Sequence, residues 1–215
     1  MDPIKKKLVS LNVSQIKQVL WKGKEITTGI FKEPVTEKVS VRGVNITGDD
    51  QADRSVHGGV NKAIYSYPTE HYPFWKKHFL EKELPYGMFG ENLSTQGLLE
   101  TETHVGDRIK IGTTELIAVQ PRMPCYKLGI RFETQNIIKK FYQSNFSGIY
   151  FKIAKEGEIQ VGDTITIIEK DPLRVSIKDI FDIIRGQGTA DQYENAVHAK
   201  HLPSGLKIQI QQLLD

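Results

Sequence analysis

The chain has 215 residues, of which 39% are apolar and 26% charged, and its formal net charge is +3. This length can bury a substantial core without disulfides, and the composition is typical of a soluble globular protein with one large domain or one domain and a small appendage. The charge is too mild to indicate a nucleic-acid binder, and no apolar run approaches the roughly 20 residues that a membrane-spanning helix needs.

The first 170 residues are predicted to be mainly β-structure. Short segments rich in β-branched and aromatic residues are separated by Gly or Asp turns, a pattern that indicates many short strands. We expect strands at residues 8–14, 29–31, 39–46, 63–67, 108–111, 115–119, 149–153 and 164–168. Two helices are expected between them, at residues 67–80 and 131–145, because apolar residues recur there at helical spacing.

Two turns share one sequence pattern. Residues 104–107 and 160–163 both end in Gly-Asp and both precede a segment of alternating apolar and polar residues. The pair predicts similar hairpin corners in a β-barrel.

The composition changes at residues 169–172, and three short helices are predicted beyond this point. The first covers residues 175–186, with Ser176 as N-cap, Asp179 three residues later and Gly186 at the C-terminus. The other two cover residues 191–201 and 202–214, and the last is entered through Pro203. We therefore expect a main domain at residues 1–170 and a helical appendage at residues 171–215.

Cys125 is the only cysteine, so it cannot close a disulfide within the chain or hold an iron–sulfur cluster. If it does chemistry, it acts as one thiolate: a nucleophile, a persulfide carrier or a soft metal ligand. Arg122, Lys127 and Arg131 are close in sequence, and cations favour the thiolate form. A buried, inert cysteine is the alternative that the sequence leaves open.

The segment at residues 49–62 carries the densest group of polar side chains. Its paired glycines allow a close approach of backbone N–H groups to an anion, and its cations suit phosphate. The alternative is a polar surface loop. The sequence has no P-loop, no Rossmann glycine pattern, no zinc-ligand spacing and no GxSxG. A nucleophilic pair of Cys125 and His57 is a further possibility, which requires the two side chains to meet in the fold. The candidate binding residues here are Arg54, His57, Gly58, Gly59 and Lys62.

A third motif, GMFGENLSTQGLL, contains Gly90 at a predicted tight turn. Glu91 supplies an acceptor and Asn92 an amide, which suit the edge of a heterocycle. A simple turn that leads into a strand is the alternative.

Four segments together resemble a known family: ADRSVHGGVNKAIYSYPTEHY, FGENLSTQGL, VGDRIKIG and VQPRMPCYKL, in this order. They are similar to the MOSC domain, named for the C-terminal domain of molybdenum cofactor sulfurases, and the likeness covers about residues 28–168. The segment from residue 171 onward resembles the three-helix extension of the bacterial YiiM-type subgroup.

This resemblance implies a mainly β fold with helices, a MOSC β-barrel related to the barrel domain of pyruvate kinase. It also implies a molybdenum pterin cofactor (Moco), with Cys125 as metal ligand or sulfur carrier. The cofactor phosphate needs cations and backbone N–H groups, and the pterin edge needs donors and acceptors. The expected contacts are Lys32, Arg54, Gly58, Gly59, Lys62 and Arg122 for the phosphate, and His57, Glu91 and Asn92 for the pterin.

The subgroup is associated with N-hydroxylated bases such as 6-hydroxylaminopurine, which implies a reductase that detoxifies N-hydroxylated compounds. The sequence shows no second redox motif, so we expect an external electron donor, a flavoprotein, haem protein or iron–sulfur protein, beside a small-molecule substrate. A sulfur carrier that forms a Cys125 persulfide and a non-catalytic ligand-binding barrel are the alternatives. A single cysteine and the absence of a secretory signal indicate the cytoplasm, with no nucleic-acid or membrane partner and with a homodimer left open.

Overall fold

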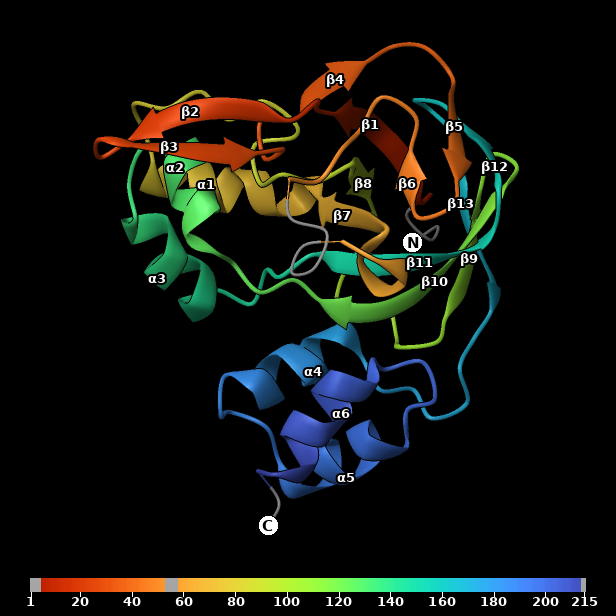
Figure 1. Cartoon of the computed structure of the whole chain (residues 1–215). Coiled ribbons are helices and arrows are strands. Elements are labelled where there is room, and N and C mark those ends of the chain that lie inside the picture. Colours follow the sequence, from red (N-terminus) through yellow and green to blue (C-terminus); the bar gives the residue numbers. More distant parts are fainter. Residues whose placement is uncertain (1–4, 53–57, 214–215) are drawn as a thin grey trace.

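The computed structural model describes residues 5–52 and 58–213, and its largest feature is an eight-stranded sheet in the order β13-β9-β10-β11-β7-β8-β1-β4 (Figure 1). Neighbouring strands are antiparallel except β7 and β8, which are parallel. The strands are β1 (Lys7–Val13), β4 (Glu33–Val35), β7 (Ile64–Pro68), β8 (Leu93–Gln96), β9 (Arg108–Ile111), β10 (Thr114–Pro121), β11 (Ile149–Lys155) and β13 (Ile165–Glu169).

Backbone hydrogen bonds connect the two ends of this sheet. The amide of Leu8, in β1, donates to the carbonyl of Asp163, and the amide of Gly162 donates to the carbonyl of Leu8, each at 2.9 Å. The amide of Ile165, at the start of β13, donates to the carbonyl of Lys6 at 2.9 Å. The first half of β1 thus pairs with the segment that enters β13, and the sheet curves back on itself as a barrel.

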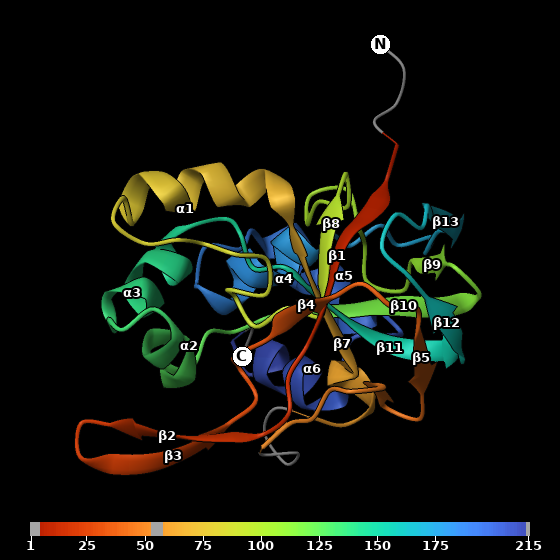
Figure 2. The ribbon, with the colours of Figure 1, turned by 90° about the horizontal axis from the view of Figure 1, so that it is seen from above.

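Two smaller sheets flank the barrel. One contains β12 (Gly157–Ile159), β5 (Val39–Arg42) and β6 (Asn45–Ile46). The other is a hairpin of β2 (Lys17–Trp21) and β3 (Lys24–Thr28), which extends away from the barrel in Figure 2. The sequence pattern did not predict this hairpin, β4 or β12, and β8 was only the alternative reading of the segment after Gly90. A strand was expected at residues 29–31, where the chain instead connects β3 to β4.

The two Gly-Asp corners have the same structure, as the sequence pattern predicts. The Asp107 carboxylate accepts a hydrogen bond from the amide of residue 104 at 3.0 Å, and the Asp163 carboxylate accepts one from the amide of residue 160 at 2.9 Å. Gly106 and Gly162 both have a positive φ, of 97° and 91°, which glycine adopts without steric cost. The two corners lead into β9 and β13, which pair with each other.

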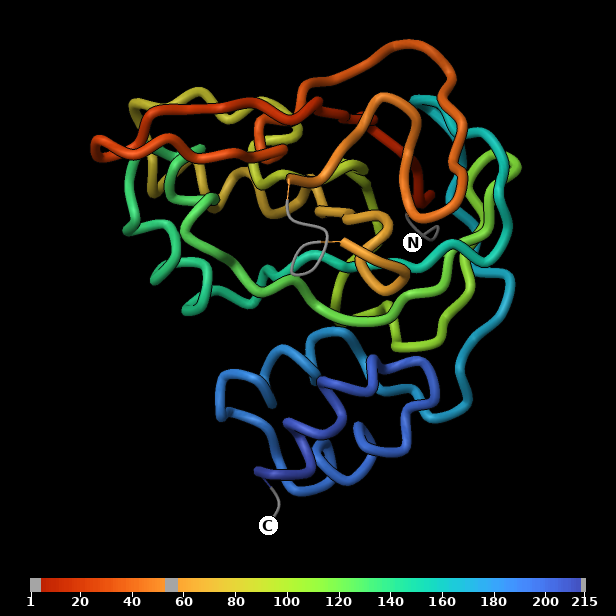
Figure 3. Tube along the Cα trace, in the orientation of Figure 1, coloured from red at the N-terminus to blue at the C-terminus, as the bar shows by residue number. Residues whose placement is uncertain are grey.

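The helices form two groups, which are separate in the tube of Figure 3. The first group lies beside the barrel and contains α1 (Tyr72–His78), α2 (Tyr126–Arg131) and α3 (Asn136–Gln143). The second contains α4 (Ile177–Ile184), α5 (Ala190–His198) and α6 (Ser204–Gln211), the three helices predicted beyond residue 171. The Ser176 side chain accepts from the amide of Asp179, and the Asp179 carboxylate accepts from the amide of Ser176, which confirms the predicted cap of α4.

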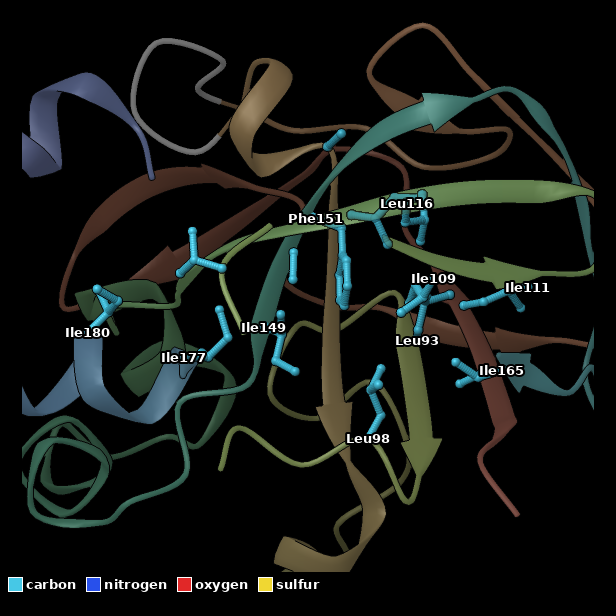
Figure 4. Close-up of a cluster of buried hydrophobic side chains, with 14 of the residues drawn as sticks. Leu93, Leu98, Ile109, Ile111, Leu116, Ile149, Phe151, Ile165, Ile177 and Ile180 are labelled. Atoms are coloured by element: carbon cyan, nitrogen blue, oxygen red, sulfur yellow. The ribbon is translucent and has the colours of Figure 1, made fainter. Parts of the chain in front are cut away.

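Buried side chains form two clusters. The larger one fills the barrel and continues onto α4, so Ile177 and Ile180 pack with barrel residues such as Ile149 and Phe151 (Figure 4). The smaller cluster is mostly aromatic and lies between the barrel and the first helix group, with Trp75 fully buried. Residues of α4 belong to the same core as the barrel. The division into two domains between residues 170 and 171 therefore stays a prediction. No helix in the described part of the chain is long and apolar enough to cross a membrane.

Candidate functional site

A cavity lies beside the end of β10, where the chain turns into α2. The hollow has a volume of about 580 Å³, including space open to solvent. Four lining side chains are cationic and one, Asp50, is acidic. The lining residues are Thr28, Gly29, Ile30, Lys32, Asp50, Gln51, Ala52, Lys62, Tyr65, Gly90, Asn92, Arg122, Cys125, Lys127 and Tyr150.

Cys125 lies in the cavity lining and is only partly buried, so it is not a fully buried core cysteine. It occupies the N-cap position of α2, and its carbonyl accepts a hydrogen bond from the amide of Leu128 at 2.9 Å. The sequence analysis missed α2 because Gly129 is a poor helix former. A Cβ atom at Gly129 would lie 2.2 Å from the end of the Gln135 side chain, so a larger residue would require that flexible side chain to move.

Arg122 is buried beside Cys125 and is held by two neighbours. Its guanidinium lies 4.8 Å from the ring centroid of Tyr65 and donates a hydrogen bond to the carbonyl of Phe89. Burial works against its charge, but the acidic groups of Tyr65, Tyr150 and Cys125 outweigh burial and raise the pKa of Arg122. The side chain therefore supplies a permanent positive charge at the cavity wall.

Lys32 and Asn92 meet at one buried carboxylate, that of Asp49. Asp49 Oδ1 contacts Lys32 Nζ and accepts from the amide of Ser14 at 2.9 Å, while Asp49 Oδ2 accepts from Asn92 Nδ2 at 2.9 Å. Burial lowers the pKa of Lys32, and Asp49 opposes this effect by favouring the charged amine. Asp49 itself does not line the cavity, but it fixes two side chains that do.

Asn92 also connects the strands around the cavity. Its side-chain oxygen accepts a hydrogen bond from the amide of Tyr65 at 3.2 Å, and its backbone amide donates to the carbonyl of Tyr65 at 2.9 Å. Its backbone carbonyl accepts from the amide of Asn12 in β1 at 2.7 Å. Much of the hydrogen-bonding capacity of Asn92 is therefore used within the protein.

Glu91 lies outside the cavity lining and is fully buried. Its carboxylate accepts hydrogen bonds from the amides of Gly87 at 2.8 Å and Phe89 at 3.0 Å, from Ser94 Oγ at 2.9 Å and from Tyr72 Oη at a shorter distance. These bonds hold the turn at Gly90, whose φ of 75° confirms the predicted tight turn. The Glu91 carboxylate is thus engaged within the protein, and it does not face the cavity.

Lys62 connects the cavity to a neighbouring groove, which it lines together with Gly58 and Gly59. The two glycines line this groove and are not among the residues that line the cavity of Cys125. Burial lowers the pKa of Lys62, and the nearby Cys125 thiol acts in the opposite direction. Arg54 and His57 lie outside the described residues.

The structure thus brings Lys32, Lys62 and Arg122 together with Cys125. Sequence reasoning missed Asp49 as the partner of Lys32, and it missed the two tyrosines of the lining, Tyr65 and Tyr150. Tyr65 lies in the HGG-x-x-K-A-x-Y motif, so the sequence could have indicated it. Tyr150 lies in no such motif, and only the pairing of β7 with β11 places it opposite Tyr65. Within the described ranges, no cluster of three or more His, Cys, Asp or Glu side chains could hold a metal ion.

Comparison with known families gives one match, to the MOSC domain, over residues 53–166. Protein YflK of Bacillus subtilis (strain 168) is 36% identical over 171 residues, which are 80% of this chain and 77% of YflK. A protein of Gibberella moniliformis called "Reductase" is 32% identical over 78% of this chain, but the match spans only 30% of that protein. Protein YiiM of Escherichia coli (strain K12) is 31% identical over 66% of this chain and 65% of YiiM.

Solved structures show the same architecture. YiiM from Geobacillus stearothermophilus superposes with a TM-score of 0.80 at 28% identity, over 98% of this chain and 100% of that chain. YiiM from Escherichia coli shares the fold with a TM-score of 0.74 at 22% identity, over 97% of this chain and 90% of that chain. The family match, the YflK identity and the common fold agree with one another, and the chain belongs to the MOSC domain family.

Proposed function

We propose that this protein binds a molybdenum pterin cofactor through Cys125 and reduces N-hydroxylated compounds with electrons from an external donor protein. The observation that carries the proposal is the cavity that combines one accessible thiol with the cations Lys32, Lys62 and Arg122. The MOSC family is associated with this cofactor, and the relative called "Reductase" supports the reaction class.

The cavity residues fit such a group chemically. A thiolate is a soft ligand that suits a sulfur-rich molybdenum centre, and Cys125 is the only thiol in the chain. The fixed charge of Arg122 and the paired amine of Lys32 suit a phosphate, because charge-assisted hydrogen bonds to phosphate are strong. When bound, the cofactor would supply the two-electron chemistry.

The residues of the cavity wall would bind the cofactor and hold it in one orientation. Arg122 is held against Tyr65 and Phe89, so its guanidinium cannot turn away from the cavity without losing both contacts. Asp49 keeps Lys32 in place in the same way. Lys127 follows Cys125 on the first turn of α2 and adds a further positive charge to the lining. A rigid, cationic wall of this kind favours an anionic cofactor over a neutral ligand.

Metal and pterin quantification tests the proposal. Wild type, Cys125→Ser and Met123→Leu are produced in a host that makes the cofactor, and molybdenum, pterin and N-hydroxy reductase activity are measured on each. Met123→Leu is the matched control, because it removes a nearby sulfur that is not in the cavity lining. We expect stoichiometric molybdenum and activity in wild type and control, and loss of both in Cys125→Ser. Wild-type protein with full reductase activity and no molybdenum would contradict the proposal.

A sulfur carrier is the second candidate function, and the partly exposed position of Cys125 near Lys62 and Arg122 favours it. Cations stabilise an anionic persulfide as they stabilise a thiolate. Incubation with a cysteine desulfurase should then add one reducible sulfur atom to the wild type and none to Cys125→Ser, as measured by intact mass. An unchanged wild-type mass would remove this candidate.

A further inference from the structure

Tyr150 is the feature of the cavity that the binding proposal does not use. It lies in β11, lines the same cavity as Cys125 and pairs in register with Tyr65 of β7. Their ring centroids are 5.1 Å apart, so the two phenols are neighbours on one wall.

The two hydroxyl groups have different surroundings. Tyr65 Oη donates a hydrogen bond to the carbonyl of Ser147 at 2.9 Å and is therefore engaged inside the protein. Tyr150 is only half-buried, and its Oη makes no hydrogen bond to the residues that the structure describes. It is not among the described side-chain atoms that are both buried and without a partner, so it is open to a ligand or to water in the cavity. A donor that is open to the cavity and is not engaged by the described residues can form a hydrogen bond to a bound ligand without breaking one inside the protein.

The geometry points to Tyr150 as the hydrogen-bond donor to the oxygen atom that leaves an N-hydroxylated substrate, and this inference rests on the proposed function. A phenol keeps its proton at neutral pH and can donate a hydrogen bond. Arg122 and Cys125 line the same cavity as Tyr150, so the phenol shares this space with the thiol and the fixed cation.

The overall reaction explains why a donor is useful there. An N-hydroxy compound takes up two electrons and two protons, the N–O bond breaks, and the products are the amine and water. The electrons come from the external donor and the protons from solvent. Negative charge develops on the oxygen as the N–O bond breaks, and a preorganised neutral donor stabilises this charge without being consumed.

Tyr150→Phe removes only the hydroxyl, and two neighbours serve as comparisons. Tyr65→Phe loses the bond to Ser147, so its melting temperature should fall by about 2–4 °C, whereas Tyr150→Phe should stay within about 1 °C of wild type. Tyr142→Phe, at a partly exposed position on α3 outside the cavity, is the neutral control. These measurements need neither cofactor nor substrate.

Molybdate is the second probe, used on cofactor-free protein by calorimetry. If Tyr150 donates to an oxygen held near Cys125, Tyr150→Phe should bind molybdate about 5- to 10-fold more weakly than wild type and Tyr142→Phe. In loaded protein the same variant should lose at least about 10-fold in kcat with KM for an N-hydroxy base changed less than about 3-fold.

Each outcome decides one statement. Unchanged molybdate affinity in Tyr150→Phe, or a loss of melting temperature equal to that of Tyr65→Phe, would overturn the assignment of Tyr150. A loaded wild type that does not reduce N-hydroxy bases would overturn the proposed function, and the cofactor-free measurements would still decide whether Tyr150 donates to a bound oxygen.

Discussion

Asp49→Asn tests how the cavity is held together. Asp49 accepts three hydrogen bonds, from Lys32, Asn92 and the amide of Ser14, and its side chain is fully buried. An asparagine keeps one acceptor but turns its amide toward Asn92 Nδ2 or Lys32 Nζ, so two donors face each other. Losing one charge-assisted bond costs about 1.5–3 kcal/mol, and an unsatisfied buried donor costs about 1–3 kcal/mol more. We therefore expect a loss of about 3–5 kcal/mol of unfolding free energy, the range for breaking a buried ion pair.

Urea unfolding at neutral pH measures this loss, and a double-mutant cycle isolates its cause. Lys32→Met alone should also destabilise, because it leaves the Asp49 carboxylate buried and without its cation. The variant Lys32→Met/Asp49→Asn removes both charges, so its loss should be at least about 1.5 kcal/mol smaller than the sum of the single losses. Additive losses, or an Asp49→Asn loss below about 1 kcal/mol, would refute the idea that this pair holds the cavity wall.

Three further predictions concern single positions. The affinity of the cofactor-free protein for phosphate should fall as pH rises through the pKa of Lys62, which burial lowers below the ordinary 10.5. Lys62→Arg should keep its phosphate affinity to higher pH, because arginine does not lose its proton. Calorimetry at several pH values measures both, and identical pH profiles would contradict the prediction. Gly90→Ala should lose about 1–2 kcal/mol in urea unfolding, because its φ is 75° and the new Cβ would lie 3.0 Å from Ile30; an unchanged midpoint would show that the turn relaxes freely. Ser176→Ala should cost about 0.5–2 kcal/mol by removing the cap of α4, with Ser204→Ala, whose side chain is outside any cap, as the control; equal effects of the two would argue against the capping box.

The sequence predicted most of the strands because their pattern is local. Alternation of apolar and polar residues placed β1, β9 and β13 within a residue or two, and the repeated Gly-Asp corner predicted two turns of equal structure. The hairpin of β2 and β3 was missed because both strands are largely exposed and lack a buried face to alternate with. The short helix α2 was missed because its glycine has a low helix propensity, which its buried position in the fold outweighs.

The residues of the candidate site were only partly predictable. Cys125 stood out as the single thiol, and Lys32, Lys62 and Arg122 were chosen for their charge, which is a property of the residue itself. In the sequence, Glu91 cannot be told apart from a carboxylate that binds a ligand. In the fold, its carboxylate accepts four hydrogen bonds from other residues of the protein.

The sequence by itself determined the fold class and the family, which are written in short contiguous patterns, and it singled out Cys125 as the one thiol of the chain. Only the tertiary structure decided which polar groups face the cavity and which are satisfied inside the protein. Asp49 pairs with Lys32 and with Asn92, and Tyr150 lies against Tyr65, through contacts between segments far apart in the chain. Hydrogen bonding depends on distances of about 3 Å, which strand pairing and packing set and which no local pattern encodes.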